Sequence, residues 1–183
     1  MLHVVIPDAE LYDESKNEFI VRKGASLTME HSLLSLSKWE SKWHKPFLSD
    51  DEKTMEETLD YYRCMTITQN VNPNVYYNIN DSVNKQIQDY MSDSMTATWF
   101  NNQVMQHDSS NSGSAITAEI IYYWMISLNI PFECQKWHLN RLITLIRVVS
   151  AKNSPPKKMS KDEILNRQRR LNAERKARLK TKG

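Results

Sequence analysis

Apolar residues recur at helical spacing in the first third of the chain. Steps of three and four residues separate four large apolar side chains: Leu33, Leu36, Trp39 and Trp43. Ser32 precedes this set as an N-cap candidate, and Pro46 follows it, where the missing backbone N–H disfavours further helix. The pattern predicts a helix with one apolar, aromatic face.

Two more helices are predicted in the middle of the chain. Thr54 and Glu57 have the spacing of a capping box, in which a hydroxyl and a carboxylate each bond one free amide at a helix start. This predicts a helix over residues 54–65. A turn-rich connection follows at residues 66–79, and Asp81 is then the expected cap of a third helix.

The most apolar region lies between residues 117 and 149. Thr117 is the expected cap of one helix, which Pro131 ends. The helix after it has five apolar residues at helical spacing: Leu139, Leu142, Ile143, Ile146 and Val149. Two such helices in succession predict a helical hairpin at the centre of the core, and Pro155 and Pro156 end the second one.

Short strands are expected near the N-terminus, at residues 3–6 and 19–22, with the polar segment 8–17 between them and Gly24 as a turn. The predicted fold class is therefore mainly α: a helical domain with a small N-terminal β ribbon and a basic C-terminal helical or disordered arm. We place the domain at residues 1–152 and the arm at residues 153–183.

The charge pattern supports this division. Residues 1–150 hold twelve basic and nineteen acidic residues, a net charge of −7, whereas residues 151–183 carry a net charge of +9. A block of like charge resists packing into a core. Ser160 and Glu163 have capping-box spacing, so a helix can begin in the arm. It has few apolar residues to bury, and we expect it to become ordered on a partner.

Candidate catalytic and metal-binding residues do not combine into a recognisable site. Three glycines are too few for a glycine-rich phosphate loop, and Cys64 and Cys134 lack CxxC spacing. Cys134 and His138 stand one helical turn apart, but no further zinc ligands occur at a matching spacing. We therefore expect no catalytic residue, no metal and no cofactor.

The residues expected to contact a partner lie in two places. Trp39 and Trp43 are candidates because Trp often anchors interfaces, although most tryptophans at helical spacing belong to a core. In the arm the candidates combine apolar and cationic side chains: Ile164, Leu165, Arg167, Arg170, Leu171 and Arg175. Nucleic acid could bind through residues 157–182, without sequence specificity because the arm has no aromatic residue for base stacking. A solubilising tail is the simplest alternative.

Several motifs carry a resemblance to a known family. They are Glu30-His31-Ser32-Leu33, Ser37-Lys38-Trp39-Glu40-Ser41-Lys42-Trp43, Pro46-Phe47-Leu48, Thr96-Ala97-Thr98-Trp99-Phe100, Pro131-Phe132-Glu133-Cys134, Trp137-His138-Leu139-Asn140-Arg141-Leu142 and Lys158-Met159-Ser160. Together with the basic end, these motifs resemble the tail assembly chaperones of long-tailed bacteriophages, over most of the chain.

The resemblance implies a mainly helical, non-enzymatic protein in the cytoplasm of the infected host cell. Such a protein binds the tape measure protein, helps to recruit tail tube protein and is absent from the finished virion. A homo-oligomer is compatible with this role, and no membrane partner is expected, because no stretch approaches the roughly eighteen apolar residues that cross a bilayer. Two other functions stay open: a structural virion protein of the head-to-tail connector, and a small DNA-binding protein that uses the basic arm.

Overall fold

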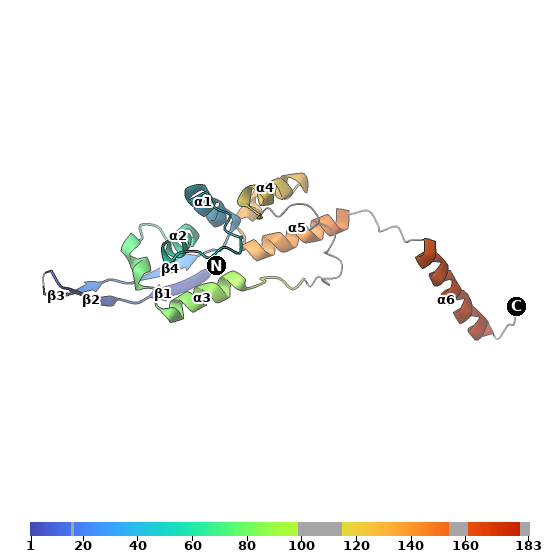
Figure 1. Cartoon of the computed structure of the whole chain (residues 1–183), viewed down its shortest axis with the longest axis horizontal. Coiled ribbons are helices and arrows are strands. Elements are labelled where there is room, and N and C mark those ends of the chain that lie inside the picture. Colours follow the sequence, from blue (N-terminus) through green and yellow to red (C-terminus); the bar gives the residue numbers. More distant parts are fainter. Residues whose placement is uncertain (16, 99–114, 154–160, 180–183) are drawn as a thin grey trace. The chain divides into compact units, whose positions relative to one another are not determined.

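The computed structural model describes residues 1–15, 17–98, 115–153 and 161–179, apart from the side chains of residues 161–164 and 177 (Figure 1). The chain divides into two compact units, Met1–Ser150 and Ala151–Gly183. The first unit lies within two residues of the predicted domain. As predicted, the described part of the chain is mainly helical, and it also contains two antiparallel strand pairs.

One long two-stranded ribbon opens the first unit. Its strands are β1 (Leu2–Ile6), β2 (Ala9–Asp13), β3 (Glu18–Arg22) and β4 (Ala25–Met29). β1 pairs with β4 and β2 pairs with β3, both antiparallel and in one common register that runs from Leu2 opposite Met29 to Asp13 opposite Glu18. The two predicted strands are confirmed. β2 and β4 were missed, because β2 lies in a polar segment and β4 follows the expected turn.

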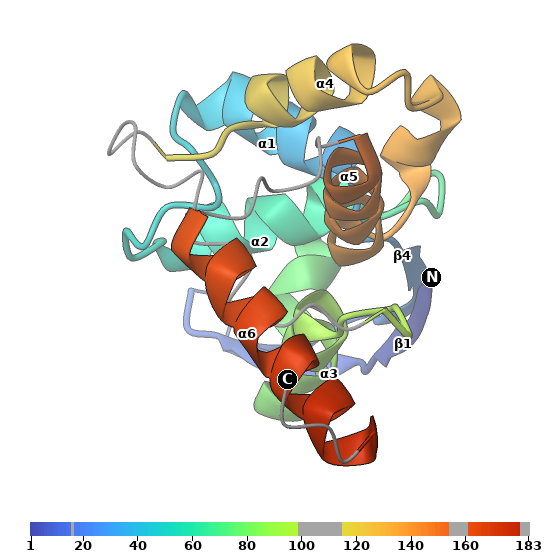
Figure 2. The ribbon, with the colours of Figure 1, turned by 90° about the vertical axis from the view of Figure 1, so that its right-hand side faces the viewer.

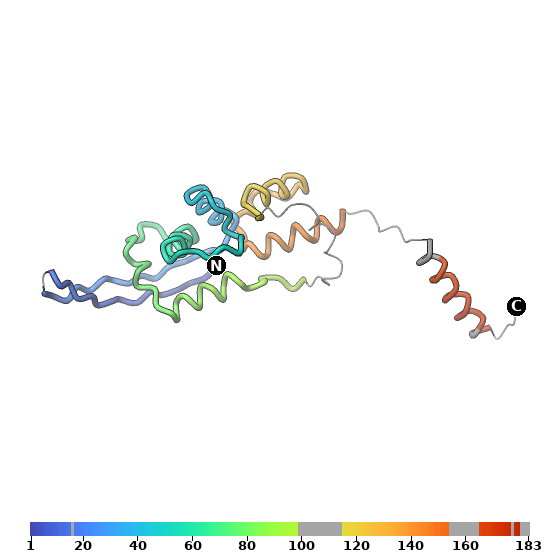
Figure 3. Tube along the Cα trace, viewed as in Figure 1, coloured from blue at the N-terminus to red at the C-terminus, as the bar shows by residue number. Residues whose placement is uncertain are grey.

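The two halves of the ribbon have different surroundings. In the proximal half, β1 and β4 send alternate side chains into the core: Val4, Ile6, Leu27 and Met29. In the distal half, seven of the ten residues of β2 and β3 are exposed and none is buried. The ladder is interrupted between the halves at Pro7, which has no backbone N–H to donate. Figure 3 shows the distal half extending beyond the helices of its own unit.

The first two helices begin where the capping patterns predict. α1 (Leu33–Trp43) starts after Ser32, whose hydroxyl accepts from the Ser35 amide. α2 (Met55–Met65) starts after Thr54, which forms the expected reciprocal capping box with Glu57. Capping satisfies amides that have no partner within the helix, so both starts are fixed by local sequence.

The next elements are a short 3-10 helix, η1 (Pro73–Asn78), and α3 (Asp81–Ser92). The predicted cap of α3 was wrong by one residue. Asn80 caps the helix through its side-chain oxygen, which accepts from the Val83 amide 2.9 Å away, and Asp81 is the first helical residue. Asn and Asp are equally good caps, and propensity alone does not choose between neighbours.

The last helices of the first unit are α4 (Ala118–Ser127) and α5 (Leu139–Asn153), joined through a short 3-10 helix, η3 (Phe132–Lys136). The break at Pro131 is confirmed. The predicted hairpin is wrong, because α4 packs mainly against α1. Figure 2 shows α4 lying across the view and α5 nearly end-on. The five residues of η3 turn the chain between them, so the two helices do not run side by side.

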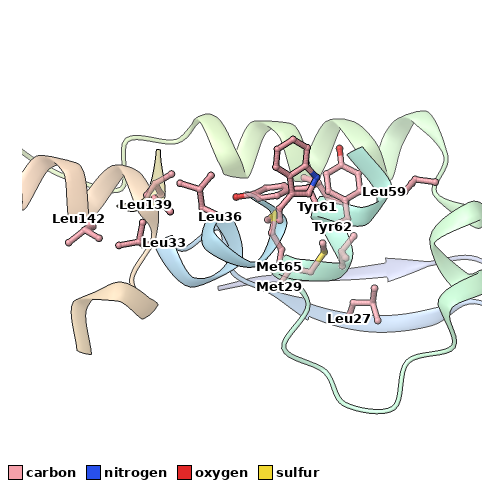
Figure 4. Close-up of a cluster of buried hydrophobic side chains, with 14 of the residues drawn as sticks. Leu27, Met29, Leu33, Leu36, Leu59, Tyr61, Tyr62, Met65, Leu139 and Leu142 are labelled. Atoms are coloured by element: carbon pink, nitrogen blue, oxygen red, sulfur yellow. The ribbon is translucent and has the colours of Figure 1, made fainter. Parts of the chain in front are cut away.

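The core of the first unit brings together β4, α1, α2 and α5. Figure 4 shows its central side chains, Leu27, Met29, Leu33, Leu36, Leu59, Tyr61, Tyr62, Met65, Leu139 and Leu142, all of them buried. Within each helix or strand, these residues recur at a spacing that places their side chains on the inner face. Burial of such side chains contributes roughly 1.5–3 kcal/mol each relative to exposure.

The second unit contains α6 (Lys161–Leu179). A helix in the arm was predicted, but the capping box expected at its start, Ser160 with Glu163, lies outside the described residues and side chains. Along the described part of the chain, no helix combines the length and apolar character required to span a membrane.

Candidate protein-binding surfaces

Helix α4 carries large apolar side chains around its whole circumference. Seven successive positions hold them: Ile120, Ile121, Tyr122, Tyr123, Trp124, Met125 and Ile126. Ile121 and Met125 face the core and are fully buried, whereas Tyr123 is 66% exposed and Ile126 is 60% exposed. A helix that is apolar on every side is normally buried on every side. The exposed side, which we call the outer α4 face (Tyr123 and Ile126), therefore fits a covering partner.

The residues after α4 enlarge this apolar region. Phe132 of η3 is 53% exposed, and its ring lies 6.3 Å from the ring of Tyr122. The Tyr122 hydroxyl donates to the Gln135 side chain at 2.9 Å, which fixes the ring beside η3. Neighbouring exposed apolar side chains on ordered elements mark interaction sites more often than single ones do.

The position of α4 depends on a buried carboxylate of α1. Glu40 is 7% exposed, and its two oxygens accept from the backbone amides of Ala118 at 2.7 Å and Phe47 at 2.8 Å. Burial raises the pKa of Glu40, and the two amide bonds offset this only in part. The Ala118 amide is one of the first in α4, where a negative charge also interacts favourably with the helix dipole. Thr117, the predicted cap, makes no side-chain capping bond.

The distal ribbon, residues 9–22, is the second surface. It exposes five large apolar side chains: Leu11, Tyr12, Phe19, Ile20 and Val21. An isolated two-stranded hairpin is marginal in water, so a fixed position needs support from the body. Asn78 of η1 gives that support, because its buried side-chain amide donates to the carbonyl oxygens of Pro7 at 3.2 Å and Arg22 at 3.0 Å.

A second clamp holds the ribbon at its interruption. The Asp8 carboxylate accepts from the Gly24 amide at 2.8 Å and from the Lys23 ammonium at 2.9 Å, and these bonds lower the pKa of Asp8. The strands approach so closely here that a Cβ atom on Gly24 would lie 2.0 Å from the Ile6 carbonyl oxygen. Only glycine fits at that position.

The tryptophans chosen from the sequence do not form a surface. Trp39 is 1% exposed, and its indole N–H donates to the Glu57 carbonyl oxygen at 2.8 Å. Trp43 is half-buried, and its indole N–H donates to the Asp60 carboxylate at 2.9 Å. The prediction of Trp39 as a partner contact is therefore wrong, because the apolar face of α1 is the face that packs into the core.

The carboxylates near α1 and α2 hold the structure together. Burial alone would raise the pKa of Asp60, but hydrogen bonds from Lys42 and Trp43 lower it below its ordinary value. The Lys45 ammonium bonds Glu57 at 2.5 Å and lowers the pKa of that carboxyl. Both carboxylates therefore already accept hydrogen bonds from side chains or backbone amides of the first unit.

Two buried histidines link the starts of α1 and α5 to α2 and α3. His31 and His138 lie with ring centroids 5.3 Å apart. His31 Nδ1 is 2.6 Å from the Tyr61 hydroxyl, and His138 Nε2 is 3.0 Å from the Tyr90 carbonyl oxygen. Burial and the neighbouring His138 lower the pKa of His31 to about 3, so the ring is neutral at pH 7. Both rings are enclosed, which suits a structural role.

The other chemical candidates are also built into the body. Burial raises the pKa of the Cys64 thiol and that of Cys134, so neither is activated as a thiolate nucleophile. The His138 ring accepts from the Asn140 amide at 3.3 Å through Nδ1, in addition to its bond with Tyr90. Among the described residues, no group of three or more His, Cys, Asp or Glu could hold a metal ion.

The arm residues chosen from the sequence lie on α6. Five of them have described side chains, and all are exposed: Leu165, Arg167, Arg170, Leu171 and Arg175. The side chain of Ile164 lies outside the description. Arg170 reaches Glu174 one turn later at 3.8 Å, a long contact between exposed groups that adds little stability. Within its unit, α6 therefore presents cationic side chains and leucines to solvent.

Two candidate surfaces that were not predicted have signals in the sequence. The helix that carries the outer α4 face was predicted at the centre of the core, although seven apolar residues in a row exceed the width of one inner helix face. The segment 8–17, taken as polar, contains two adjacent large apolar residues, Leu11 and Tyr12. The role of Asn78 has no sequence signal, because it depends on contacts with residues more than fifty positions away.

Comparisons of this chain with protein-family models, with curated proteins and with solved structures find no match.

Proposed function

We propose that this protein is a non-enzymatic tail assembly chaperone of a long-tailed bacteriophage, which binds the tape measure protein in the host cytoplasm and helps tail tube assembly. The observation that carries the proposal is the outer α4 face, where Tyr123 and Ile126 stay exposed on a helix whose opposite side is locked into the core. The family in this proposal comes from the resemblance of the sequence motifs. The outer α4 face is the surface that we propose for the binding this family implies.

A helical partner suits this surface. Side chains three residues apart on one helix form ridges that pack between the side chains of another helix. A long helical protein such as a tape measure exposes apolar stripes until the tail tube encloses it, and such stripes aggregate when uncovered. Covering them with the outer α4 face would remove apolar area from water on both proteins, at about 25 cal/mol per Å² of apolar surface.

Co-expression tests the proposal. We expect the tape measure protein of the same phage to be soluble and to co-purify with the tagged chain. The double variant Tyr123→Ser with Ile126→Ser should lose this co-purification while keeping the far-UV circular dichroism of the parent. Met55→Ser is the matched control, because Met55 is 73% exposed on α2, away from α4. A tape measure protein that stays soluble alone and does not bind the parent chain would refute the proposal.

The basic arm supports a second candidate, non-specific DNA binding. Exposed arginines stand at several successive turns of α6, and residues 151–183 have a net charge of +9. Binding by phosphate contacts would weaken steeply as salt rises, because each contact releases counterions. DNA affinity that depends on salt and disappears when residues 154–183 are removed would favour this candidate. Protein analysis of purified particles separates both from a connector, which would be abundant in virions.

A further inference from the structure

We propose that the distal ribbon is a docking surface for an extended, positively charged segment of another protein. The inference is independent of the function of the outer α4 face. It rests on the ribbon's exposed apolar side chains, its open strand edges, its charge and the groove beside it.

The ribbon is a built projection. The clamps at Asn78 and Asp8 hold its base, and the register with the proximal half is continuous. On one face Leu11 lies opposite Ile20, and on the other Tyr12 lies opposite Phe19 with ring centroids 5.2 Å apart. Phe19 is 74% exposed. Cross-strand apolar pairs on both faces of a ribbon leave large apolar area in water unless a partner covers it.

The strands also have free hydrogen-bonding edges. The β2–β3 sheet has two strands, so each has one edge that pairs with no strand in the described part of the chain. In the proximal half, by contrast, β4 receives a hydrogen bond at the Thr28 carbonyl from the Ile67 amide at 2.8 Å. An open edge accepts an extended segment as an added strand, whose backbone gives affinity and whose alternate side chains give specificity.

Charge selects the occupant. The ribbon, residues 9–22, holds four acidic residues, Glu10, Asp13, Glu14 and Glu18, against Lys16 and Arg22, a net charge of −2. Nucleic acid and anionic membranes are repelled by such a surface, and so is the same ribbon of a second copy. A cationic segment is attracted, and like-charge juxtaposition disfavours the wrong partners.

A groove beside the ribbon could hold side chains of the partner segment. It measures about 530 Å³ and is bordered by Leu11, Tyr12, Asp13, Glu14, Ser15, Ile20, Arg22 and Asn74. The strand side chains Leu11, Tyr12 and Ile20 make its wall apolar, Asp13 and Glu14 lie toward the ribbon tip, and Arg22 lies at the base of the ribbon. An extended segment that alternates apolar and cationic residues, added at a strand edge, would place its apolar side chains on the face of Leu11 and Ile20 and its cations on the opposite face, which carries Glu10.

The test uses the full-length, ¹⁵N-labelled protein and three short capped peptides, which alternate valine with lysine, valine with glutamate, and serine with lysine. We expect the valine–lysine peptide to shift the amide resonances of residues 9–22, with weaker binding at high salt. The other two peptides should bind far more weakly, because each lacks either the positive charge or the apolar side chains.

Two variants locate the contact. Glu10→Gln should weaken binding of the valine–lysine peptide about two- to fivefold, as expected for one exposed ion pair. Ile20→Ser, on the face that receives the valines, should weaken it as well. The matched controls are Asp51→Asn with Glu52→Gln, which removes two exposed acids elsewhere, and Met55→Ser.

Three outcomes would overturn the inference: equal binding of the valine–glutamate peptide, resonance shifts confined to other parts of the chain, or loss of affinity in the controls as large as in the ribbon variants. Self-association of the parent chain that disappears in Phe19→Ser would also overturn it, because the occupant would then be a second copy. Sedimentation velocity at several concentrations measures that alternative.

Discussion

The Glu40 carboxylate accepts a hydrogen bond from the Ala118 amide, 78 residues further along the chain, at 2.7 Å. Through this bond and its second one to Phe47, one buried acid sets the start of α4 against the end of α1. The exposed apolar side of α4 thus has a fixed orientation. A flexible helix would turn that side inward, since burial of its side chains is favourable.

Glu40→Gln should lower the free energy of unfolding by about 1–3 kcal/mol, because an amide group offers one acceptor oxygen and turns an N–H toward a backbone donor. Urea unfolding followed by Trp fluorescence measures the change. Glu56→Gln, on the exposed side of α2, is the control and should have little effect. Equal stability of the two variants would mean that Glu40 does not anchor α4.

His31 makes the protein sensitive to acid. The pKa of His31 is about 3 in the folded protein, whereas its ordinary value is 6.5. Between these pH values the ring is protonated in the unfolded chain and neutral in the folded one. Stability is therefore complete above pH 6.5 and falls as the pH drops from 6.5 toward 3. His31→Gln should be less stable at pH 7 but should show a flatter decline over this range. Unfolding midpoints in urea at several pH values test this, and an unchanged slope would contradict it.

Glu57 gives a pH dependence in a lower range. Hydrogen bonds from Lys45 and the Thr54 amide lower its pKa below the ordinary 4.5. Its contribution to stability is therefore present above pH 4.5 and is lost as the pH falls through the lowered folded pKa. Glu57→Gln should be destabilised most at neutral pH, with its difference from the parent shrinking below pH 4.5. Thermal unfolding of both proteins across this range measures the difference.

Asn78→Ala should loosen the distal ribbon without unfolding the body. The variant removes the donors to the Pro7 and Arg22 carbonyl oxygens, so amide hydrogen exchange should accelerate in residues 9–22 and change little in α2. Asn74→Ala, at an exposed position of the same 3-10 helix, is the control. Uniform acceleration throughout the body would show that Asn78 supports the whole unit and not the ribbon in particular.

Gly24→Ala should lower the free energy of unfolding more than the addition of one methyl group normally does. The added methyl group would meet the Ile6 carbonyl oxygen and the Pro7 backbone, which cannot move aside as a side chain can. We expect a loss at or beyond the upper end of about 1–3 kcal/mol, seen as a lower thermal midpoint. Ser26→Ala on the neighbouring strand is the control. A variant as stable as the parent would mean that the strands separate easily at this point.

Local signals in the sequence account for much of the fold. Ser32 and Thr54 start their helices through contacts within three residues, so a reader of the sequence can place both starts. Pro131 breaks a helix through its own covalent structure. The strand β2 was missed because its side chains are exposed on both faces and leave no core-facing alternation.

The candidate surfaces depended on tertiary information. Trp39 looked like an interface residue, but the residue that accepts its indole hydrogen bond, Glu57, belongs to a different helix. Helix α4 was predicted at the centre of the core, because an apolar sequence does not reveal which side of a helix its neighbours cover. Capping is local, and the caps Ser32 and Thr54 were predicted from it, whereas exposure depends on how helices pack and was not predicted.

The shared register of the two ribbon halves determines how the length of the ribbon can change. Each added pair of opposed residues would lengthen the projection by about 3.3 Å, and two residues added to each strand would keep every side chain on its original side. An odd insertion in a single strand would instead exchange the two sides beyond it. Natural variants whose ribbon differs in length should therefore gain or lose the same number of residues in each strand.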